Sequence, residues 1–275
     1  MPLVEYEGSD DDSDESDSVA AQDESESPPK PPRKLPTLSS NLVLPRPIDD
    51  PALHQGRVRS IPHVNGQFAA YIFVPVVLHG STKRFVDNLV TESMALQPGL
   101  HDIRTQDRSQ LHVSLSRLLL LSASQRDDLK MTLRAIALAF QCFRASFSSF
   151  SVLTNDEKTR HFLAMDVGAG HNEFQDLVVA LRPGLRAIHQ KDFYTEPKFH
   201  ASFAWTLALD VSNSKEVNSC TSTPPPYLED LRSTFQEHHA TTLQTTMTFD
   251  VKEIAARIGK DVYRWPLVEA SNALF

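Results

Sequence analysis

Two short segments with the same alternating pattern constrain the fold of this chain most strongly. Residues 111–116 and 199–204 each place His and Ser between apolar residues, and their histidines lie 88 residues apart. Side chains along a β-strand point alternately to opposite faces. We therefore expect two strands that bury one face, with His112, Ser114 and Ser116 on the other face of the first, and His200 and Ser202 together on the second.

Helical and strand periodicities interleave around these two segments. The pattern predicts two lobes of an α+β fold with some internal duplication. We expect a turn at 154–159, a helix break at Pro183 and a turn at Gly259. The expected helices are 81–96, 124–143, 172–190 and 227–239, and the further strands are 68–74 (closed by Pro75), 147–153, 162–167, 243–255 and 262–267.

The first 50 residues differ in composition from the rest of the chain. They hold 13 acidic and 4 basic side chains, whereas residues 51–275 are nearly neutral with 22 acidic and 23 basic. An acidic, Pro-rich segment buries too little apolar surface to offset its ordering entropy. We expect a disordered tail over 1–50, in which Lys30, Arg33 and Lys34 form a weak basic patch, followed by one folded domain over 51–275 with a flexible loop at about 212–226.

Composition also excludes several classes of protein. The charge balance of 51–275 argues against a strongly basic nucleic-acid coating protein. Two cysteines, Cys142 and Cys220, do not form a disulfide scaffold or a cysteine-based zinc site. The acidic N-terminus does not resemble a signal peptide, and no apolar run is long enough to span a bilayer. We expect a soluble protein of a reducing compartment that is not secreted and has no contact with a membrane.

The paired histidines and serines carry the chemistry that the sequence suggests. Two imidazoles that titrate near neutral pH can act as general base and general acid on one reacting centre, and hydroxyls can donate to phosphate oxygens. These imidazoles and hydroxyls are suited to phosphodiester cleavage without a metal or other cofactor. In RNA the 2′-hydroxyl is already next to the phosphorus and can act as the nucleophile.

A tripeptide this short also arises by chance, and each histidine taken singly is as readily a partly buried strand residue. A third match starts at His79 and precedes a helix, and the related tripeptide His239-Ala240-Thr241 lies at an expected helix end. The sequence lacks a Gly-rich phosphate loop, a His-Glu-x-x-His motif and a Cys-x-x-Cys motif. Nucleoside triphosphatase and zinc-hydrolase functions therefore have no support.

Beyond these residues, the chain resembles the two-histidine (2H) phosphoesterase superfamily, and more specifically the U6 snRNA 3′-end processing phosphodiesterases. The resemblance covers most of residues 56–210. It is carried by the two His-x-Ser strands, by 56–59 with Pro62 and His63, by 154–160 and by 193–205. The stretch 154–160 is far more specific than His-x-Ser, whereas similarity beyond Asp210 is weak.

The resemblance implies two pseudo-symmetric lobes, each with an antiparallel sheet and flanking helices, around a central cleft. It implies a 3′→5′ exoribonuclease that trims the oligouridine tail of U6 snRNA in the nucleus. The residues of this chain that match the family's catalytic residues are His112, Ser114, His200 and Ser202. Tyr194 matches an aromatic residue of the family near the cleft, which suits stacking on a base. From the residues alone, Tyr194 is equally a core or turn aromatic.

We expect His200 to be the base and His112 the acid, with Ser114 and Ser202 on the phosphate oxygens and Ser116 beside them on the substrate. The expected partner is an RNA 3′ end, and we expect a monomer without a cofactor or bound metal. Two alternatives remain open: a cyclic phosphodiesterase acting on small nucleotides, and a non-catalytic RNA 3′-end-binding splicing adaptor. The product is either a 2′,3′-cyclic phosphate or an opened 3′ phosphate.

Overall fold

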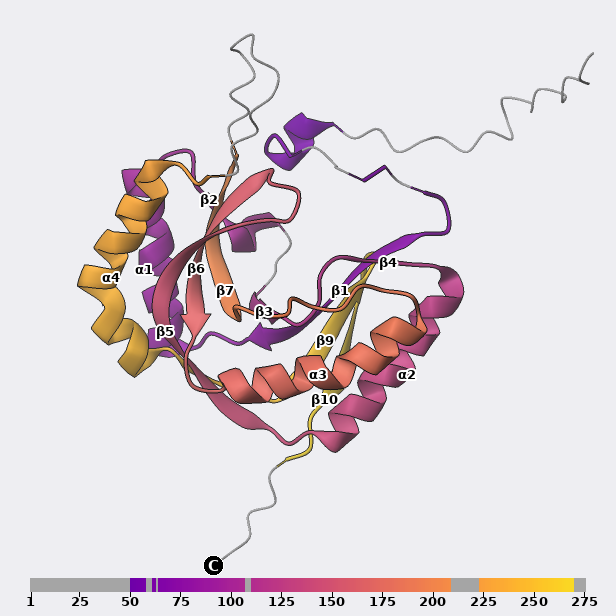
Figure 1. Ribbon diagram of the computed structural model, residues 1–275. Coiled ribbons are helices and arrows are strands. Elements are labelled where there is room, and N and C mark those ends of the chain that lie inside the picture. Colours follow the sequence, from indigo (N-terminus) through magenta and orange to yellow (C-terminus); the bar gives the residue numbers. More distant parts are fainter. Residues whose placement is uncertain (1–49, 58–60, 63, 107–109, 209–222, 270–275) are drawn as a thin grey trace, which may run out of the picture. The chain divides into compact units, whose positions relative to one another are not determined.

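In the part of the chain that the structure describes, two antiparallel sheets of five strands each carry the two histidine segments, one segment in each sheet (Figure 1). The computed structural model describes residues 50–57, 61–62, 64–106, 110–208 and 223–269, which belong to one compact unit, Pro47–Phe275. The expected tail 1–50, apart from Asp50, and residues 212–222 of the expected loop lie outside the described residues. Within the described residues no helix is both long and apolar enough to cross a membrane.

The first sheet has the order β10-β9-β1-β3, with β4 paired to the start of β1, and the second has the order β2-β7-β6-β5-β8. The strands are β1 (Phe68–Val76), β2 (His101–Asp102), β3 (Leu111–Ser114), β4 (Leu119–Leu121), β5 (Phe143–Thr154), β6 (Arg160–Val167), β7 (His200–Leu207), β8 (Thr248–Val251), β9 (Glu253–Ile258) and β10 (Asp261–Pro266). The α-helices are α1 (Gly80–Leu96), α2 (Ala123–Ala139), α3 (His171–Ala187) and α4 (Pro226–Thr246), and the short 3₁₀ helices are η2 (Pro51–His54) and η3 (Ile103–Gln106).

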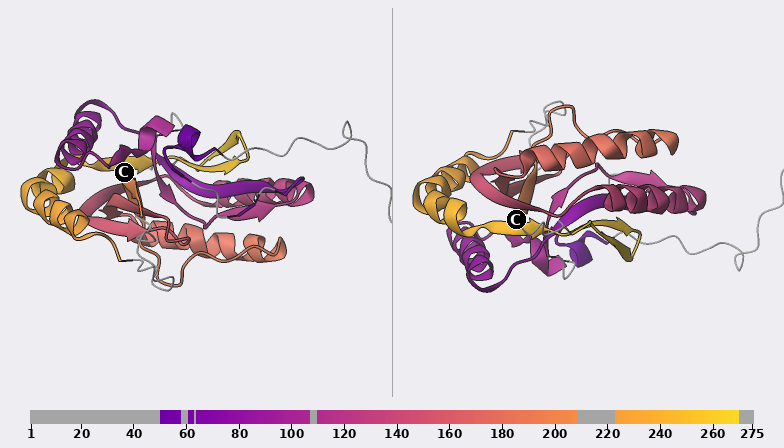
Figure 2. Two further views of the ribbon diagram at one scale, coloured as in Figure 1. Left: turned by 90° about the horizontal axis from the view of Figure 1, so that it is seen from above. Right: turned by 90° about the horizontal axis from the view of Figure 1, so that it is seen from below.

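The two halves of the chain repeat one order of elements, as the sequence predicts. The first half runs β1, α1, β3 and α2, and the second runs β6, α3, β7 and α4. Each half also receives a strand from later in the chain: β5, which follows α2, pairs with β6 of the second half, and β9, which comes after β8, pairs with β1 of the first half. The two sheets form separate layers, with α1 beside α4 and α2 beside α3 (Figure 2).

The helices form where apolar stripes and caps coincide. Ser122 caps α2, since its hydroxyl accepts from Gln125 N, and the Gln125 side chain accepts from Ser122 N in return. Leu129, Leu133 and Ile136 follow at helical spacing and are buried. The other three helices bury similar stripes, so each sheet is covered by helices over one continuous apolar core.

The end of α4 and the strand after it are the clearest correction to the sequence prediction. We expected the helix to end at His239 and a strand to begin at Leu243, but α4 continues to Thr246. Leu243 is fully buried and lies two four-residue steps beyond buried Phe235, so it extends the helical apolar stripe. Packing of this stripe outweighs the weak helix propensity of the Thr residues around it. The motif at His239 therefore lies inside a helix.

Two prolines interrupt regular structure less than expected. Pro183 lies inside α3, which does not break there. The carbonyl that loses its helical partner belongs to Val179, whose residue is exposed, so water can replace the missing N–H. Pro75 lies inside β1, which continues to Val76. The pairing of β1 with β9 ends at Phe73, so β1 is paired on one side only at Pro75, where a missing donor is tolerated.

Candidate active site

The two histidine segments meet, although they belong to different sheets. β3 is an edge strand of the first sheet and packs against β7, an inner strand of the second. His112, Ser114, His200 and Ser202 all line one cavity of about 440 Å³. The apolar residues between them are buried on the opposite faces, as alternation predicts. The structure thus brings together the four residues that the sequence singles out.

One hydrogen bond determines the protonation of the His200 ring. Its Nδ1 lies 2.7 Å from the carbonyl oxygen of Lys198. A carbonyl only accepts, so Nδ1 carries a proton and Nε2 of the neutral ring keeps its lone pair. Burial lowers the pKa of His200 below its ordinary value, an effect that the Lys198 carbonyl and the charge of Asp166 oppose. The neutral ring, which can accept a proton, is therefore the form favoured at neutral pH.

Asp166 is a neighbour of His200 that the sequence analysis did not single out. It lies directly opposite His200 in the β6–β7 pairing, on the same face of the sheet. Its two carboxylate oxygens accept from the hydroxyls of Ser149 (3.1 Å) and Ser151 (2.6 Å) on β5. An acidic side chain in an otherwise apolar strand was the available signal. Asp166 supplies a fixed negative charge near the imidazole.

His112 is held in an aromatic environment on the other side of the cavity. Its ring centroid lies 5.2 Å from that of Phe73 in an edge arrangement and 5.9 Å from that of Tyr71. Both aromatic residues are on β1, and Pro75 of the same strand is the register partner of His112. The two histidines thus have different surroundings, which their similar strands did not reveal.

Tyr194 lines the same cavity and is fixed by a charged pair. Its hydroxyl donates to Asp156 Oδ1 at 2.6 Å, and the Arg117 guanidinium carbon lies 4.1 Å from its ring centroid. Arg117 Nε is also 3.8 Å from Asp156 Oδ2. Burial first, and then the bond to Asp156, raises the pKa of Tyr194 to about 12. Tyr194 is therefore a neutral, oriented aromatic surface, 37% exposed, at the cavity wall.

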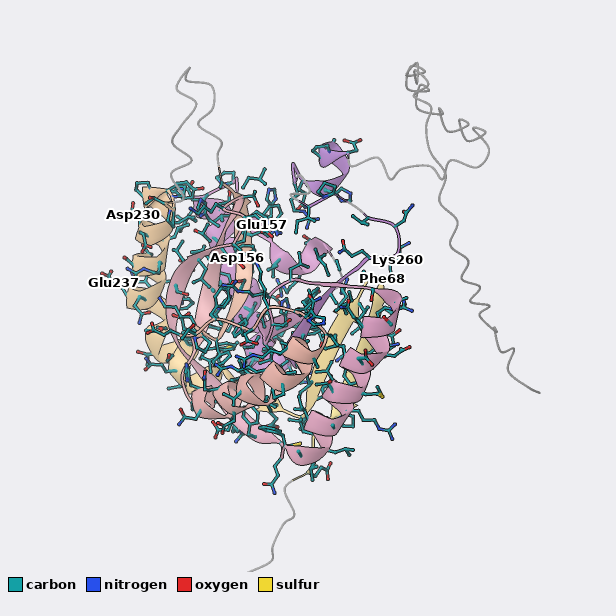
Figure 3. The ribbon with its side chains drawn as sticks, turned by 45° about the vertical axis from the view of Figure 1, so that its right-hand side comes forward. Phe68, Asp156, Glu157, Asp230, Glu237 and Lys260 are labelled. Atoms are coloured by element: carbon teal, nitrogen blue, oxygen red, sulfur yellow. The ribbon has the colours of Figure 1, made fainter. Side chains whose placement is uncertain are left out.

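The turn between β5 and β6 contributes a further part of this wall. Thr154, Asn155 and Asp156 line the cavity, and Figure 3 shows Asp156 beside Glu157 in this turn. Asn155 holds the turn closed, because its side-chain oxygen accepts from the backbone N–H groups of Thr159 (2.9 Å) and Arg160 (2.8 Å). The specific stretch 154–160 therefore shapes the site. The remaining lining residues are Ile103, Leu153, Phe162, Phe193, Glu196 and Lys198.

Ser116, which we expected beside the substrate, lies away from the cavity. β3 ends at Ser114, and the chain then bends so that Ser116 is only 5% exposed and does not line the cavity. Its hydroxyl accepts from Ile72 N (2.9 Å) and donates to the carbonyl of Arg117 (2.9 Å). The Ile72 carbonyl accepts from Leu115 N, so the Ser116 hydroxyl occupies the place of a strand carbonyl. The alternation of side chains does not extend to Ser116 because β3 ends at Ser114, before the alternating sequence pattern ends.

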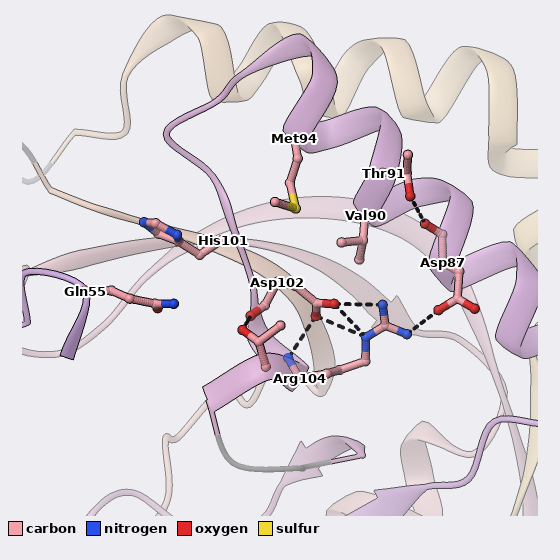
Figure 4. A pocket seen from close by; sticks show the side chains of 9 residues that line it. Gln55, Asp87, Val90, Thr91, Met94, His101, Asp102 and Arg104 are labelled. Carbon is pink, nitrogen blue, oxygen red and sulfur yellow. Dashed lines mark hydrogen bonds and ion pairs between the residues drawn. The ribbon is translucent and has the colours of Figure 1, made fainter. Parts of the chain in front are cut away.

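A second cavity of about 520 Å³ lies outside this site, between α1, β2 and η3 (Figure 4). Arg104 lines this cavity and is paired with two carboxylates, since it donates to both oxygens of Asp102 and to Asp87 on α1. These contacts raise the pKa of Arg104, with the bond to Asp102 as the largest cause. The preceding residue, Ile103, lines the active-site cavity. The ion pairs thus anchor η3, which forms one wall of the site.

No group of three or more His, Cys, Asp or Glu side chains in the described ranges is placed to hold a metal ion. The cavity lining includes two imidazoles and two serine hydroxyls, a set suited to acid–base chemistry and to binding of phosphate oxygens.

Comparison with known proteins places this architecture in a family. A family model described as an uncharacterised conserved protein, HVSL, matches residues 29–266, and its label spells the residues from His112 to Leu115. The U6 snRNA phosphodiesterase 1 of Mus musculus is 31% identical over 184 residues, which cover 65% of this chain and 67% of the mouse protein. That of Xenopus laevis is 26% identical over 260 residues, covering 91% of this chain and 98% of the relative.

The fold is also that of a solved relative. The structure of Usb1 from Kluyveromyces marxianus superposes with a TM-score of 0.54 at 18% identity, covering 72% of this chain and 98% of Usb1, and a second structure of it contains uridine monophosphate. The family match, the curated relatives and the two sheets that meet at paired His-x-Ser strands agree. This chain belongs to the U6 snRNA phosphodiesterase family and has its two-histidine phosphoesterase fold.

Proposed function

We propose that this protein is a phosphodiesterase that shortens the 3′ end of U6 snRNA, acting as a metal-independent 3′→5′ exoribonuclease on an oligouridine tail. The observation that carries the proposal is the convergence of His112, Ser114, His200 and Ser202 on one cavity. The relatives named above are U6 snRNA phosphodiesterases, which supports the choice of substrate.

His200 is the general base in this mechanism. Its Nδ1–H donates a hydrogen bond to the Lys198 carbonyl, so Nε2 is the atom that takes the proton from the 2′-hydroxyl of the penultimate nucleotide. The 2′-oxygen then attacks the last phosphate, and the positive charge that forms on the ring is stabilised by nearby Asp166. Asp166 stabilises this charge without touching the reacting atoms.

His112 is the general acid on the opposite side of the cavity. The bond from phosphorus to the 5′-oxygen of the terminal nucleoside breaks, and this oxygen receives the His112 proton. The hydroxyls of Ser114 and Ser202 donate to the two non-bridging oxygens as negative charge develops there. The products are a nucleoside and an RNA shortened by one nucleotide that ends in a 2′,3′-cyclic phosphate, or in a 3′ phosphate if water then opens the ring.

Tyr194 supplies the surface for the terminal base. Its ring lines the cavity and is oriented by Asp156 and Arg117, and an aromatic ring can stack on any base. The solved relative was crystallised with uridine monophosphate, which supports a uridine in this position. We further propose that the protein acts in the nucleus as a monomer, with RNA as its partner.

The test is gel analysis of a 5′-labelled RNA ending in oligouridine, incubated with EDTA. The wild type is compared with His200→Ala and with the matched control His79→Ala, which removes an exposed histidine of the third His-x-Ser match, outside the cavity. A parallel RNA carries 2′-deoxy at the penultimate sugar. We expect a shortening ladder with wild type and control, none with His200→Ala, and none on the deoxy RNA.

Activity that requires added magnesium after EDTA treatment, or cleavage of the deoxy RNA, would overturn the mechanism. Preference for a small cyclic nucleotide over the RNA would instead select the cyclic phosphodiesterase function. RNA binding that weakens in His200→Ala, without cleavage by the wild type, would indicate the non-catalytic adaptor.

A further inference from the structure

Two arginines from motifs that the proposed chemistry does not use lie together at one end of the cleft face of the second sheet. Arg160 is the first residue of β6 and ends the specific stretch 154–160. Arg57 belongs to the segment 56–59 that also carries the family resemblance. Both residues are partly buried. Neither lines the active-site cavity, so their role lies outside the chemistry at the histidines.

The pairing of β6 with β7 places these arginines on the face that carries the active site. Asp166 is opposite His200, Ala164 is opposite Ser202, and Phe162 is opposite Trp205 after a bulge. Phe162 lines the active-site cavity. Arg160 is two residues before Phe162, so the alternation of β6 puts both side chains on one face. The Arg160 guanidinium carbon lies 5.4 Å from the Phe162 ring centroid.

Arg57 reaches the same place from another segment. Its guanidinium carbon lies 5.7 Å from the ring centroid of Trp205, the cross-strand partner of Phe162, and its Nε donates to the carbonyl of His54 at 3.0 Å. The segment is docked closely, because Gly56 has φ +80° and an added Cβ would lie 2.7 Å from Leu207 Cδ1. Leu207 is the strand partner of Arg160. The two guanidiniums therefore flank one aromatic pair.

The charge of Arg160 is poorly compensated. In the part of the chain that the structure describes, no ion pair or hydrogen bond of the Arg160 guanidinium is found. Burial first, and then the charge of Arg57, lowers the pKa of Arg160, and only Glu157 opposes this. A partly buried guanidinium beside a second positive charge favours an anion as its partner. Guanidinium groups present paired N–H donors that match the oxygens of a phosphate.

We propose that Arg57 and Arg160 bind a backbone phosphate of the RNA several nucleotides upstream of the scissile bond. The site would direct the 5′ part of the strand out along the cleft face of the second sheet. From Asp166, opposite His200, to Arg160 is six residues, or about 20 Å at the usual rise per residue of a strand. An extended single strand of a few nucleotides spans this length. The inference rests on the proposed function, because it takes RNA as the ligand.

The affinity for an RNA that cannot be cleaved tests the arginine site independently of catalysis. The probe is a fluorescent oligouridine of about eight nucleotides with 2′-deoxy at the penultimate sugar, titrated at several salt concentrations. The proteins are wild type, Arg57→Gln, Arg160→Gln and the control Arg134→Gln, which removes an exposed charge on α2 outside the active-site cavity. The same proteins are assayed for cleavage of a uridine dinucleotide, which is too short to reach the arginines.

We expect each site variant to bind the long RNA roughly 10-fold more weakly, as for loss of one charged hydrogen-bonded contact. The slope of log affinity against log salt should decrease, by up to about 0.7 for the one phosphate that the two arginines share. Cleavage of the dinucleotide and the behaviour of Arg134→Gln should match the wild type. Because Arg57 and Arg160 lie on separate segments, a folding defect in one variant leaves the other informative.

Long-RNA affinity and salt slope equal to wild type in both site variants would overturn the inference. An equal loss of dinucleotide cleavage would also overturn it, since the arginines would then act on the catalytic cavity. Failure of the proposed function gives a different result, in which the wild type does not cleave the dinucleotide while the arginine-dependent binding of the long RNA persists.

Discussion

Replacement of Ser116 by Ala tests most directly whether this serine serves the substrate or the fold. The Ile72 N–H that bonds to the Ser116 hydroxyl belongs to a residue with no exposed surface. Loss of the hydroxyl leaves this donor without a partner, which costs about 1–3 kcal/mol. The Arg117 carbonyl also loses a donor, at about 0.5–1 kcal/mol. We expect the free energy of unfolding to fall by about 2–3 kcal/mol.

For a folded domain of this size, each kcal/mol corresponds to roughly 2–4 °C in Tm, so Ser116→Ala should melt about 4–12 °C lower. Thermal and urea unfolding followed by circular dichroism measure this change, and RNA cleavage is assayed at 20 °C, where the variant remains folded. The matched control is Ser114→Ala, two residues earlier, which lines the cavity. It should lose activity while its Tm stays near the wild-type value.

The opposite pattern would refute the reasoning. If Ser116→Ala melts with the wild type and loses as much activity as Ser114→Ala, then Ser116 contacts the substrate and its bond to Ile72 contributes nothing to stability.

Four further predictions concern the site, its walls and the pH dependence of activity and stability. His112→Ala and His200→Ala should each lower kcat/KM on RNA by about 10²–10⁴-fold with little change in Tm, as measured by initial rates and thermal unfolding. Because burial lowers the pKa of His200 from 6.5, the acidic limb of the profile of kcat/KM against pH should lie below 6.5, and a limb above this value would contradict the base assigned here. Tyr194→Phe keeps the ring but loses the bond to Asp156, so KM for RNA should rise by about 3- to 10-fold with kcat nearly unchanged, whereas an unchanged KM would show that this bond does not orient the ring. Burial also makes stability depend on pH, because it lowers the pKa values of both His200 and buried His161. The unfolded chain therefore binds more protons than the folded protein just below pH 6.5. We expect the free energy of unfolding to decrease as pH falls through that range.

Much of the fold was predictable because it depends on local periodicity. Alternation located both histidine strands, and the 3.6-residue stripe located the four α-helices of the described residues. The errors occurred where packing decided the outcome, as at Leu243, which burial keeps in α4 despite its Thr-rich surroundings. Asp156 was within a recognised stretch, but its role in holding Tyr194 depends on a contact between residues 38 positions apart.

The sequence by itself determined which side chains share a face, since alternation within a strand is a local property of the backbone. It therefore identified His112 with Ser114 and His200 with Ser202. Only the tertiary structure decided that β3 and β7, from different sheets, meet at one cavity. It also decided that the Lys198 carbonyl assigns the His200 proton and that Arg57 lies beside Arg160. These outcomes depend on how two sheets and their helices pack over a shared core, and no local pattern encodes that packing.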